Sequence, residues 1–188
     1  MAKQKIPCPT ALRLLLRYEP ETGKLFFRKR ALAWSTDKAQ AMAWNAKYAD
    51  KETFRSIGTN GYLMGYILGA NKTAHRVIMA MHLGMWPTCD VDHIDGDRHN
   101  NRLENLRLAT RQQNLRNTGS RKGSSSQFCG VGWDASRGKW TTYCTGPDGR
   151  MRHLGRFADE ADAARAYDKA AREWHGEFAR LNFPPEAG

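Results

Sequence analysis

Residues 91–114 read VDHIDGDRHNNRLENLRLATRQQN, and this stretch decides the fold that we predict for the centre of the chain. Val91 and His93 alternate with polar neighbours, and Leu106 and Leu108 do so again after a polar loop. Alternation with a period of two predicts two short strands, and the Asp-Gly pair just after the first is a turn signal. The stretch therefore predicts a strand, a loop and a second strand.

A helix is expected directly after the second strand. Thr110 and Gln113 form a capping-box pattern, which predicts that the helix begins at Thr110 and carries Asn114 one turn inside it. A hairpin packed on this helix can aim Asp92, His93 and Asn114 at a common point. Carboxylate and amide oxygens suit a hard divalent ion such as Mg²⁺, which binds through one or two protein groups plus substrate phosphate.

The imidazole of His93 is left for proton chemistry in this arrangement. Near its ordinary pKa it can take a proton from water at neutral pH, a contribution of roughly 10²- to 10⁴-fold in rate. A bound metal would neutralise the scissile phosphate and the departing 3′ oxygen. Asn105 is expected to fix the loop and the orientation of His93. These residues predict metal-assisted cleavage of a phosphodiester.

The same stretch resembles the HNH motif of the ββα-metal endonucleases, in the form carried by bacteriophage homing and nicking endonucleases. That form is DHxDGxxxNNxxxNLRxxTxxxN after a helix that opens with His-Arg, and the resemblance covers about residues 62–118. The roles that the resemblance implies are general base for His93, middle asparagine for Asn105, and metal ligation for Asp92 and Asn114. Mg²⁺ is the expected ion, with Mn²⁺ as the alternative.

The cysteines do not form a zinc-binding pattern. Many relatives in the wider superfamily hold a structural zinc with CxxC pairs, whereas Cys8, Cys89, Cys129 and Cys144 are scattered here. We therefore expect no structural zinc. Unpatterned cysteines also fit reduced thiols in the cytoplasm.

Composition indicates a polyanionic partner. Thirty Lys and Arg against 19 Asp and Glu give a net charge of +11, which most simply means double-stranded DNA. No stretch approaches the roughly 18 apolar residues of a membrane span, and the first twenty residues have too short an apolar run for a secretory signal. We expect a cytoplasmic monomer with no small-molecule cofactor and no membrane partner.

Residues 1–60 are interpreted as a basic N-terminal lead-in, with 12 Lys and Arg against five Asp and Glu. A short helix is expected over residues 10–18, and GKLFFRKR, residues 23–30, predicts a strand with an aromatic face. Residues 34–51 are polar and rich in Ala and Lys. They could form a DNA-contacting arm or a plain connector, and the sequence favours neither.

The nuclease domain is predicted over residues 61–118. A β-hairpin around Gly69–Lys72 is expected to lead into a helix opened by His75 and its neighbouring arginine. A helix-start cap and a supporting role at the catalytic site both remain open for His75. Residues 119–127, GSRKGSSSQ, have the composition of a flexible tether, and we place the domain boundary there.

The last predicted domain covers residues 128–184. Strands are expected over residues 129–134, 139–145 and 150–157, with a Pro-Asp-Gly turn between the second and third. A helix over residues 159–175 should follow, stopped by a glycine. The small and aromatic residues that recur at helical spacing, and that we expect to face the sheet, are Ala161, Ala164, Tyr167, Ala171 and Trp174.

This segment resembles the plant APETALA/ethylene-response-factor DNA-binding domain over nearly its whole length. The matching residues are Gly130-Val131, Gly138-Lys139-Trp140, Leu154-Gly155 with Phe157, Glu160-Ala161, Ala166-Tyr167-Asp168 with Ala170-Ala171, Gly176, and Leu181-Asn182-Phe183-Pro184. The sequence departs from that pattern at Gly132, Arg137 and His153, where the plant domain has other residues. The resemblance implies binding through the sheet, but not the same target sequence.

Charge also favours the sheet as the DNA-binding side. Residues 128–157 carry five Lys and Arg against two acids, whereas residues 158–175 carry three against five. A three-stranded sheet can lie in the major groove. The residues expected to contact DNA along the chain are Arg76, Arg98, Arg116, Arg121, Lys122, Arg137, Lys139, Trp140, Arg150 and Arg152.

The chain is therefore predicted to be a modular α+β protein: a ββα-metal HNH module plus a three-stranded antiparallel sheet packed on one helix. The predicted function is a metal-dependent, phage homing-type DNA endonuclease, and one copy of the motif predicts nicking of one strand. A sequence-specific DNA-binding protein with a degenerate nuclease module is the alternative, although none of His93, Asp92 and Asn114 is lost. RNA is a weaker alternative substrate, because nothing in the sequence resembles an RNA-stacking platform.

Overall fold

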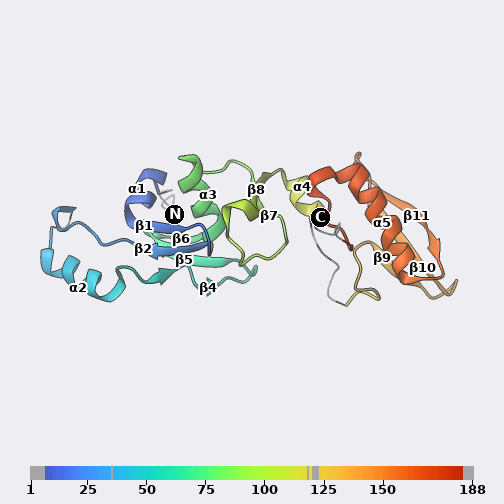
Figure 1. Cartoon of the computed structure of the whole chain (residues 1–188), viewed down its shortest axis with the longest axis horizontal. Helices are drawn as coiled ribbons and strands as arrows, with labels where there is room; N and C mark the ends of the chain where they lie inside the picture. The colour runs from blue at the N-terminus through green and yellow to red at the C-terminus, as the bar shows by residue number, and fades with distance from the viewer. Residues whose placement is uncertain (1–6, 35, 118, 120–122, 184–188) are drawn as a thin grey trace, which may run out of the picture. The chain divides into compact units, whose positions relative to one another are not determined.

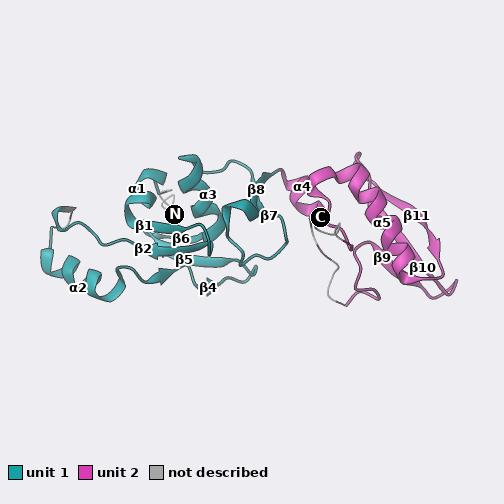
Figure 2. Cartoon of the chain, in the orientation of Figure 1, with its two compact units in different colours: residues 1–109 teal, residues 110–188 magenta. Residues whose placement is uncertain are grey.

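The structure is a computed structural model that describes residues 7–34, 36–117, 119 and 123–183 (Figure 1). The chain forms two compact units, residues 1–109 and residues 110–188 (Figure 2). Small antiparallel sheets and separate helices make up the described part, which confirms the predicted α+β class. Arg121, Lys122 and much of the expected tether lie outside the described residues.

The first unit contains three small sheets, with strand orders β1-β2-β3, β4-β5-β6 and β7-β8. Its elements are α1 (Pro9–Leu15), β1 (Leu16–Glu19), β2 (Lys24–Phe27), η1 (Leu32–Trp34), α2 (Lys38–Tyr48), β3 (Glu52–Thr53), β4 (Ser56–Ile57), β5 (Leu63–Ile67), β6 (Ala70–Thr73), α3 (Ala74–Leu83), β7 (Asp90–His93), η2 (Leu103–Asn105) and β8 (Leu106–Ala109). Helices α1 and α3 pack against each other, and α3 also packs on β5 and β6 (Figure 1).

One hydrophobic core joins the expected lead-in to the expected nuclease domain. Leu16 and Leu25 are buried in the same cluster as Ile78 of α3 and Val91 of β7. The structure therefore places no domain boundary at residue 60. The physical reason is that the apolar faces of α3 and β7 need a cover, and α1 with the β1-β2 hairpin supplies it.

Three details of the N-terminal region differ from the prediction. The helix expected over residues 10–18 ends at Leu15, because Leu16 begins β1 and pairs with Phe27. The predicted strand over residues 23–30 is shorter, since β2 ends at Phe27. The polar stretch over residues 34–51 contains helix α2, whose N-cap Asp37 accepts a hydrogen bond from the backbone of Gln40.

The central motif folds as predicted from its sequence. β7 and β8 pair antiparallel, and α4 (Arg111–Arg116) begins after Thr110 with both capping-box hydrogen bonds to and from Gln113. The preceding hairpin, β5 and β6, turns at Leu68-Gly69, where both residues have positive φ. Helix α3 then ends at Gly84 in the left-handed conformation.

The second unit is a three-stranded sheet, order β11-β10-β9, packed on one long helix. Its elements after α4 are β9 (Val131–Asp134), β10 (Lys139–Thr145), β11 (Met151–Phe157), α5 (Glu160–His175) and η3 (Gly176–Phe178). These strands and this helix lie where the sequence predicted them. Helix α4, expected within the nuclease domain, is grouped with this unit, so the division falls at residues 109/110 rather than in the tether.

Helix α5 faces the sheet with small side chains, and part of the predicted stripe lies on this face. Ala164 and Ala171 are fully buried and Tyr167 is nearly so, whereas Ala161 and Trp174 are only partly buried. The sequence-based stripe omits Ala163, Ala170, Asp168 and His175, which are also buried. The buried side of α5 is therefore wider than a strict helical stripe, because the sheet covers it along its length.

Candidate active site

The β7-β8 pair sets Asp92 directly opposite Arg107. Arg107 donates to Asp92 Oδ2 from Nε at 2.9 Å and from Nη2 at 2.8 Å, and both side chains are largely buried. Cross-strand partners share one face of a sheet, so a strand register would have predicted this ion pair. Arg107 thus holds the Asp92 carboxylate in a fixed orientation near the end of β7.

His93 is buried beside Asn101, a residue that the sequence reasoning missed. The two side chains are 3.0 Å apart between His93 Nε2 and Asn101 Oδ1, and His93 and Asn101 are 3% and 1% exposed. Asn101 Nδ2 donates to the carbonyl of His99 at 3.2 Å, which fixes which amide atom faces the imidazole. Asn101 Oδ1 only accepts, so His93 Nε2 carries the hydrogen and Nδ1 is the basic nitrogen.

Burial lowers the pKa of His93, while the hydrogen bond to the Asn101 side chain and the nearby carboxylates of Asp95 and Asp92 oppose that shift. The imidazole is therefore neutral at pH 7, which is the form that accepts a proton. The proton-accepting role predicted from the sequence requires this neutral form.

Asn105 holds the loop between the strands rather than the imidazole. Its Oδ1 accepts from the backbone of Asp95 at 3.0 Å, and its Nδ2 donates to Asp95 Oδ1 at 2.9 Å and to the carbonyl of Asn100 at 2.8 Å. The expectation that Asn105 fixes the loop agrees with these bonds. The expectation that it orients His93 does not, because Asn101 makes that contact.

Two further rings pack against His93. The His75 ring lies 5.1 Å from it edge-on, and the Tyr62 ring stacks at 5.8 Å. His75 is buried, and its pKa is lowered to about 3, first by burial and then by the charges of His93 and Arg76. Thr73, not His75, is the N-cap of α3. Of the two roles left open for His75, these contacts favour support of the catalytic site.

The neutral His75 should make stability depend on pH. Between its ordinary pKa of 6.5 and its folded value of about 3, the unfolded chain binds a proton that the folded chain does not, so stability falls as pH falls. The slope from one such group is roughly 1.4 kcal/mol per pH unit. Urea unfolding of wild type and His75→Gln at several pH values between 4 and 7 measures it. Equal slopes in both proteins would contradict a neutral, buried His75.

The metal ligands predicted from the motif belong to different units. Asp92 is in β7, and Asn114 lies on α4 in the second unit, where its backbone bonds to the Thr110 carbonyl at 3.0 Å. Within the described ranges no group of three or more His, Cys, Asp or Glu side chains could hold a metal. The donors that the motif supplies are two oxygen groups, and oxygen ligands suit Mg²⁺.

Two arginines of the first unit that were expected to contact DNA bond to the protein instead. Arg76 donates to the carbonyls of Cys89 and Pro87 at 2.9 and 2.7 Å, and so holds the segment that enters β7. Arg98 donates to the carbonyl of Asn60 at 2.6 Å while remaining exposed. Arg76 is therefore a structural residue, because its guanidinium is used by backbone carbonyls.

The strand register decides which side of the second sheet each residue predicted for DNA occupies. Thr142 and Cys144 are buried against α5, so Trp140, two residues before Thr142 on β10, also lies on the helix side. Arg152 pairs with Cys144 across the strands, and its guanidinium lies 5.6 Å from the Trp174 ring of α5, although its side chain is 53% exposed. The DNA contacts of Trp140 and Arg152 stay predictions.

The outer face carries a different set of side chains. Tyr143 is exposed, its ring lies 5.0 Å from that of His153, and His153 Nε2 is 3.1 Å from Thr141 Oγ1. Arg156 pairs with Thr141 across the strands, and its Nε lies 3.4 Å from Asp134 Oδ2. Of the residues of this sheet and its turns that were predicted to contact DNA, four are exposed: Arg137, Lys139, Arg150 and Arg152.

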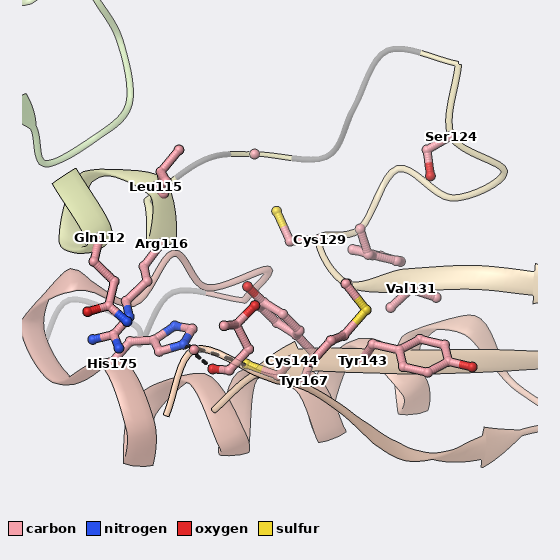
Figure 3. A pocket seen from close by; sticks show the side chains of 16 residues that line it. Gln112, Leu115, Arg116, Ser124, Cys129, Val131, Tyr143, Cys144, Tyr167 and His175 are labelled. Atoms are coloured by element: carbon pink, nitrogen blue, oxygen red, sulfur yellow. Dashed lines mark hydrogen bonds between the residues drawn. The ribbon is translucent and has the colours of Figure 1, made fainter. Parts of the chain in front are cut away.

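A cavity of about 560 Å³ lies within the second unit (Figure 3). Arg116 of α4, predicted for DNA, and His175 of α5 both line it. His175 Nε2 lies 2.7 Å from the carbonyl of Thr145, and burial lowers its pKa. Within the described part of the chain, Arg116 Nε and His175 Nδ1 are buried without a hydrogen-bond partner. Sequence alone assigns no role to His175.

Comparison with known proteins places the motif in a family. The family model described as HNH endonuclease matches residues 72–116, the segment that contains Asp92, His93 and Asn105. Protein 3.8 of Escherichia phage T7 is 32% identical over 108 residues, which are 53% of this chain and 88% of that protein. The chain belongs to the HNH endonuclease family.

Two further relatives match this HNH endonuclease over different lengths. An uncharacterized HNH endonuclease of Acanthamoeba polyphaga mimivirus is 35% identical over 130 residues, 67% of this chain and 65% of that protein. Dehydration-responsive element-binding protein 2C of Arabidopsis thaliana is 48% identical over 48 residues, 25% of this chain and 14% of that protein. The latter likeness fits a DNA-binding domain.

A solved structure titled DNA binding and cleavage by the HNH homing endonuclease I-HmuI is 21% identical, with a TM-score of 0.34 over 73% of this chain and 70% of that chain. No helix within the described ranges of this HNH endonuclease has the length and apolar content needed to cross a bilayer. The family assignment rests on the motif and the phage relative, and it makes the chain a nuclease.

Proposed function

We propose that this nuclease is a phage homing-type enzyme that acts as a monomer and nicks double-stranded DNA. The observation that carries the proposal is the buried hydrogen bond between His93 Nε2 and Asn101 Oδ1, in the residue next to the Asp92 carboxylate that Arg107 holds. In the proposed step, His93 Nδ1 takes a proton from water while the water oxygen bonds to phosphorus. The bond from phosphorus to the 3′ oxygen breaks, and that oxygen takes a proton from solvent. One motif per chain gives one cut strand.

A divalent metal completes the proposed site, and we propose Mg²⁺ held by Asp92 and Asn114. When bound, such an ion supplies charge stabilisation to the scissile phosphate. Asp92 fits this role because it supplies carboxylate oxygens, the ligands that Mg²⁺ prefers. Arg107 orients the carboxylate through Oδ2.

The second unit is proposed to recognise the DNA site. Support comes from the outer face of its sheet, where Tyr143, His153 and Arg156 are exposed, and from the exposed basic residues Arg137 and Lys139. A sheet face of this kind can read base edges in the major groove. The likeness of part of the chain to a dehydration-responsive element-binding protein agrees with that role.

Supercoiled plasmid tests the function directly. Purified protein should convert supercoiled plasmid to open circle in the presence of Mg²⁺, and EDTA should stop the conversion. Linear product at the earliest times would mean that both strands are cut in one binding event, against nicking by a monomer. Retarded plasmid without any open circle, with either Mg²⁺ or Mn²⁺, would favour a DNA-binding protein and overturn the nuclease proposal.

Asp92→Ala and Asn114→Ala should raise the metal concentration needed for half-maximal nicking as well as lower the rate. Each substitution removes one of the two proposed oxygen ligands. The protein would then hold the metal ion through a single side chain, so its affinity for the ion should fall. Titration of Mg²⁺ and Mn²⁺ at fixed DNA concentration measures the change. Glu104→Ala, which removes an exposed acid of η2, is the control and should behave as wild type. Unchanged metal dependence in both variants would contradict the ligand assignment.

A further inference from the structure

A tyrosine from the N-terminal hairpin reaches into the loop of the HNH motif. The hydroxyl of Tyr18, in β1, donates to the carbonyl of Asn101 at 3.2 Å and accepts from the backbone N–H of Leu103 at 2.9 Å. Burial raises the pKa of Tyr18, so its hydroxyl keeps its proton near neutral pH. One side chain therefore bridges two backbone groups that lie 83 and 85 residues away in the sequence.

The turn of the same hairpin lies against the same peptide. Gly23 has φ of +71°, and a Cβ built on it would lie 2.7 Å from the Arg102 nitrogen and 2.7 Å from the Asn101 carbonyl carbon. Real Cβ atoms do not approach backbone atoms so closely, so glycine is required here for both the left-handed conformation and the contact. The hairpin itself is anchored in the core by Leu16 and Leu25.

Asn101 is thus held at both ends. Its backbone is fixed by Tyr18 and Gly23, and its side chain bonds to His93 Nε2 at 3.0 Å. A carbonyl displaced by even a fraction of an ångström would carry the amide with it, because the residue is only 1% exposed and has no room to readjust. The orientation of the imidazole and the position of its proton therefore depend on the hairpin.

We propose that Tyr18 and Gly23 are positioning residues for His93 that act through Asn101, so the β1-β2 hairpin belongs to the catalytic apparatus. The inference rests on the proposed role of His93 as general base. It gives the β1-β2 part of the lead-in a role that the sequence did not predict. The hairpin positions the loop that holds the proposed general base. The β1-β2 hairpin thereby links the unit core to the chemistry.

Tyr18→Phe removes only the hydroxyl and tests the proposal by kinetics. We expect kcat for nicking to fall roughly 10- to 100-fold, since a misplaced catalytic group can cost about 10² in rate. The Kd for DNA, measured by gel shift with EDTA, should stay within about twofold of wild type. Gly23→Ala should have the same signature. Ile67→Val, a core substitution in β5 outside the hairpin, is the control for lost stability alone, and its kcat should stay near the wild-type value.

The imidazole itself supplies a readout that needs no activity. In ¹⁵N spectra that correlate ring nitrogens with ring protons, wild-type His93 should be the Nε2–H tautomer. Tyr18→Phe and Gly23→Ala should shift it toward a mixture of tautomers, and Ile67→Val should not. Unchanged His93 spectra in both Tyr18→Phe and Gly23→Ala overturn the proposal, as does a kcat loss in Ile67→Val equal to that in Tyr18→Phe. If the wild-type protein does not nick DNA, the proposed function is refuted. The positioning of His93 by Tyr18 and Gly23 is then still tested by the spectra.

Discussion

His93→Ala should abolish nicking while DNA affinity stays nearly intact. The imidazole is assigned to proton transfer, whose loss costs about 10²- to 10⁴-fold in rate, and it is too deeply buried to serve mainly as a phosphate contact. Open-circle formation at saturating DNA measures the rate, and gel shift in EDTA measures the affinity. Among single substitutions we expect this one to have the largest kinetic effect.

Stability must be separated from chemistry in this experiment. The substitution leaves Asn101 Oδ1 buried without the bond from His93, at a cost of about 1–3 kcal/mol, so thermal unfolding should be followed in parallel. His82→Ala, at an exposed position near the end of α3, is the matched histidine control and should nick normally. If rate and affinity fell together in His93→Ala, the residue would be structural or a DNA contact, and the base would have to be sought elsewhere.

The catalytic motif could be predicted in detail because its determinants are local. Strand alternation around His93, the turn after it and the capping box at Thr110 each depend on residues a few positions apart, and each is present in the structure. Asn101 was missed because its contact with His93 arises from the path of the loop between β7 and η2. Arg107 could have been found, since pairing Val91 with Leu108 already sets Asp92 opposite Arg107.

The N-terminal region was harder to predict because its apolar run fits both a helix and a strand. Residues 12–18 satisfy helical spacing, yet Leu16 starts β1 because Phe27 offers a strand partner. Nothing local indicates that Tyr18 bonds to a loop 83 residues away. Tertiary partners decide between the two states in such segments, and they also decide which residues complete the site.

The sheet of the second unit shows why composition alone misassigns a binding surface. Counting basic residues identified the sheet but not its faces, and Arg152 proves to lie on the helix side. Alternation from the buried Thr142 would have placed Trp140 correctly. Alternation would not have placed the residues of β11 correctly. The pairing of β10 with β11 shifts register between Thr142 and Tyr143, which changes which residues face outward, and no sequence pattern marks this shift.

Removal of the sheet and helix α5 of the second unit should leave a metal-dependent nuclease with weakened affinity and relaxed site choice. Truncation after Ser120 keeps the core of the first unit and also α4, which carries Asn114. The proposed metal site contacts phosphate, which every DNA sequence carries, whereas the lost sheet is the proposed reader of base edges. A tethered second binding unit also raises the effective concentration of the first on nearby DNA. Circular dichroism and thermal unfolding check that the shortened chain folds.

Two arginines of β11 give a matched pair for the same question in the intact chain. Arg156 lies on the outer face beside Asp134, and Arg152 lies on the helix side beside Asp148. Arg156→Gln should weaken binding to the preferred site by about 1–3 kcal/mol if it reads a base, and Arg152→Gln should do less. Nicking sites mapped on one long DNA separate the outcomes for the full-length, truncated and substituted proteins. If the truncated protein cut the same sites equally well at the same concentration, recognition would belong to the first unit, and the outer face of the sheet would have no part in it.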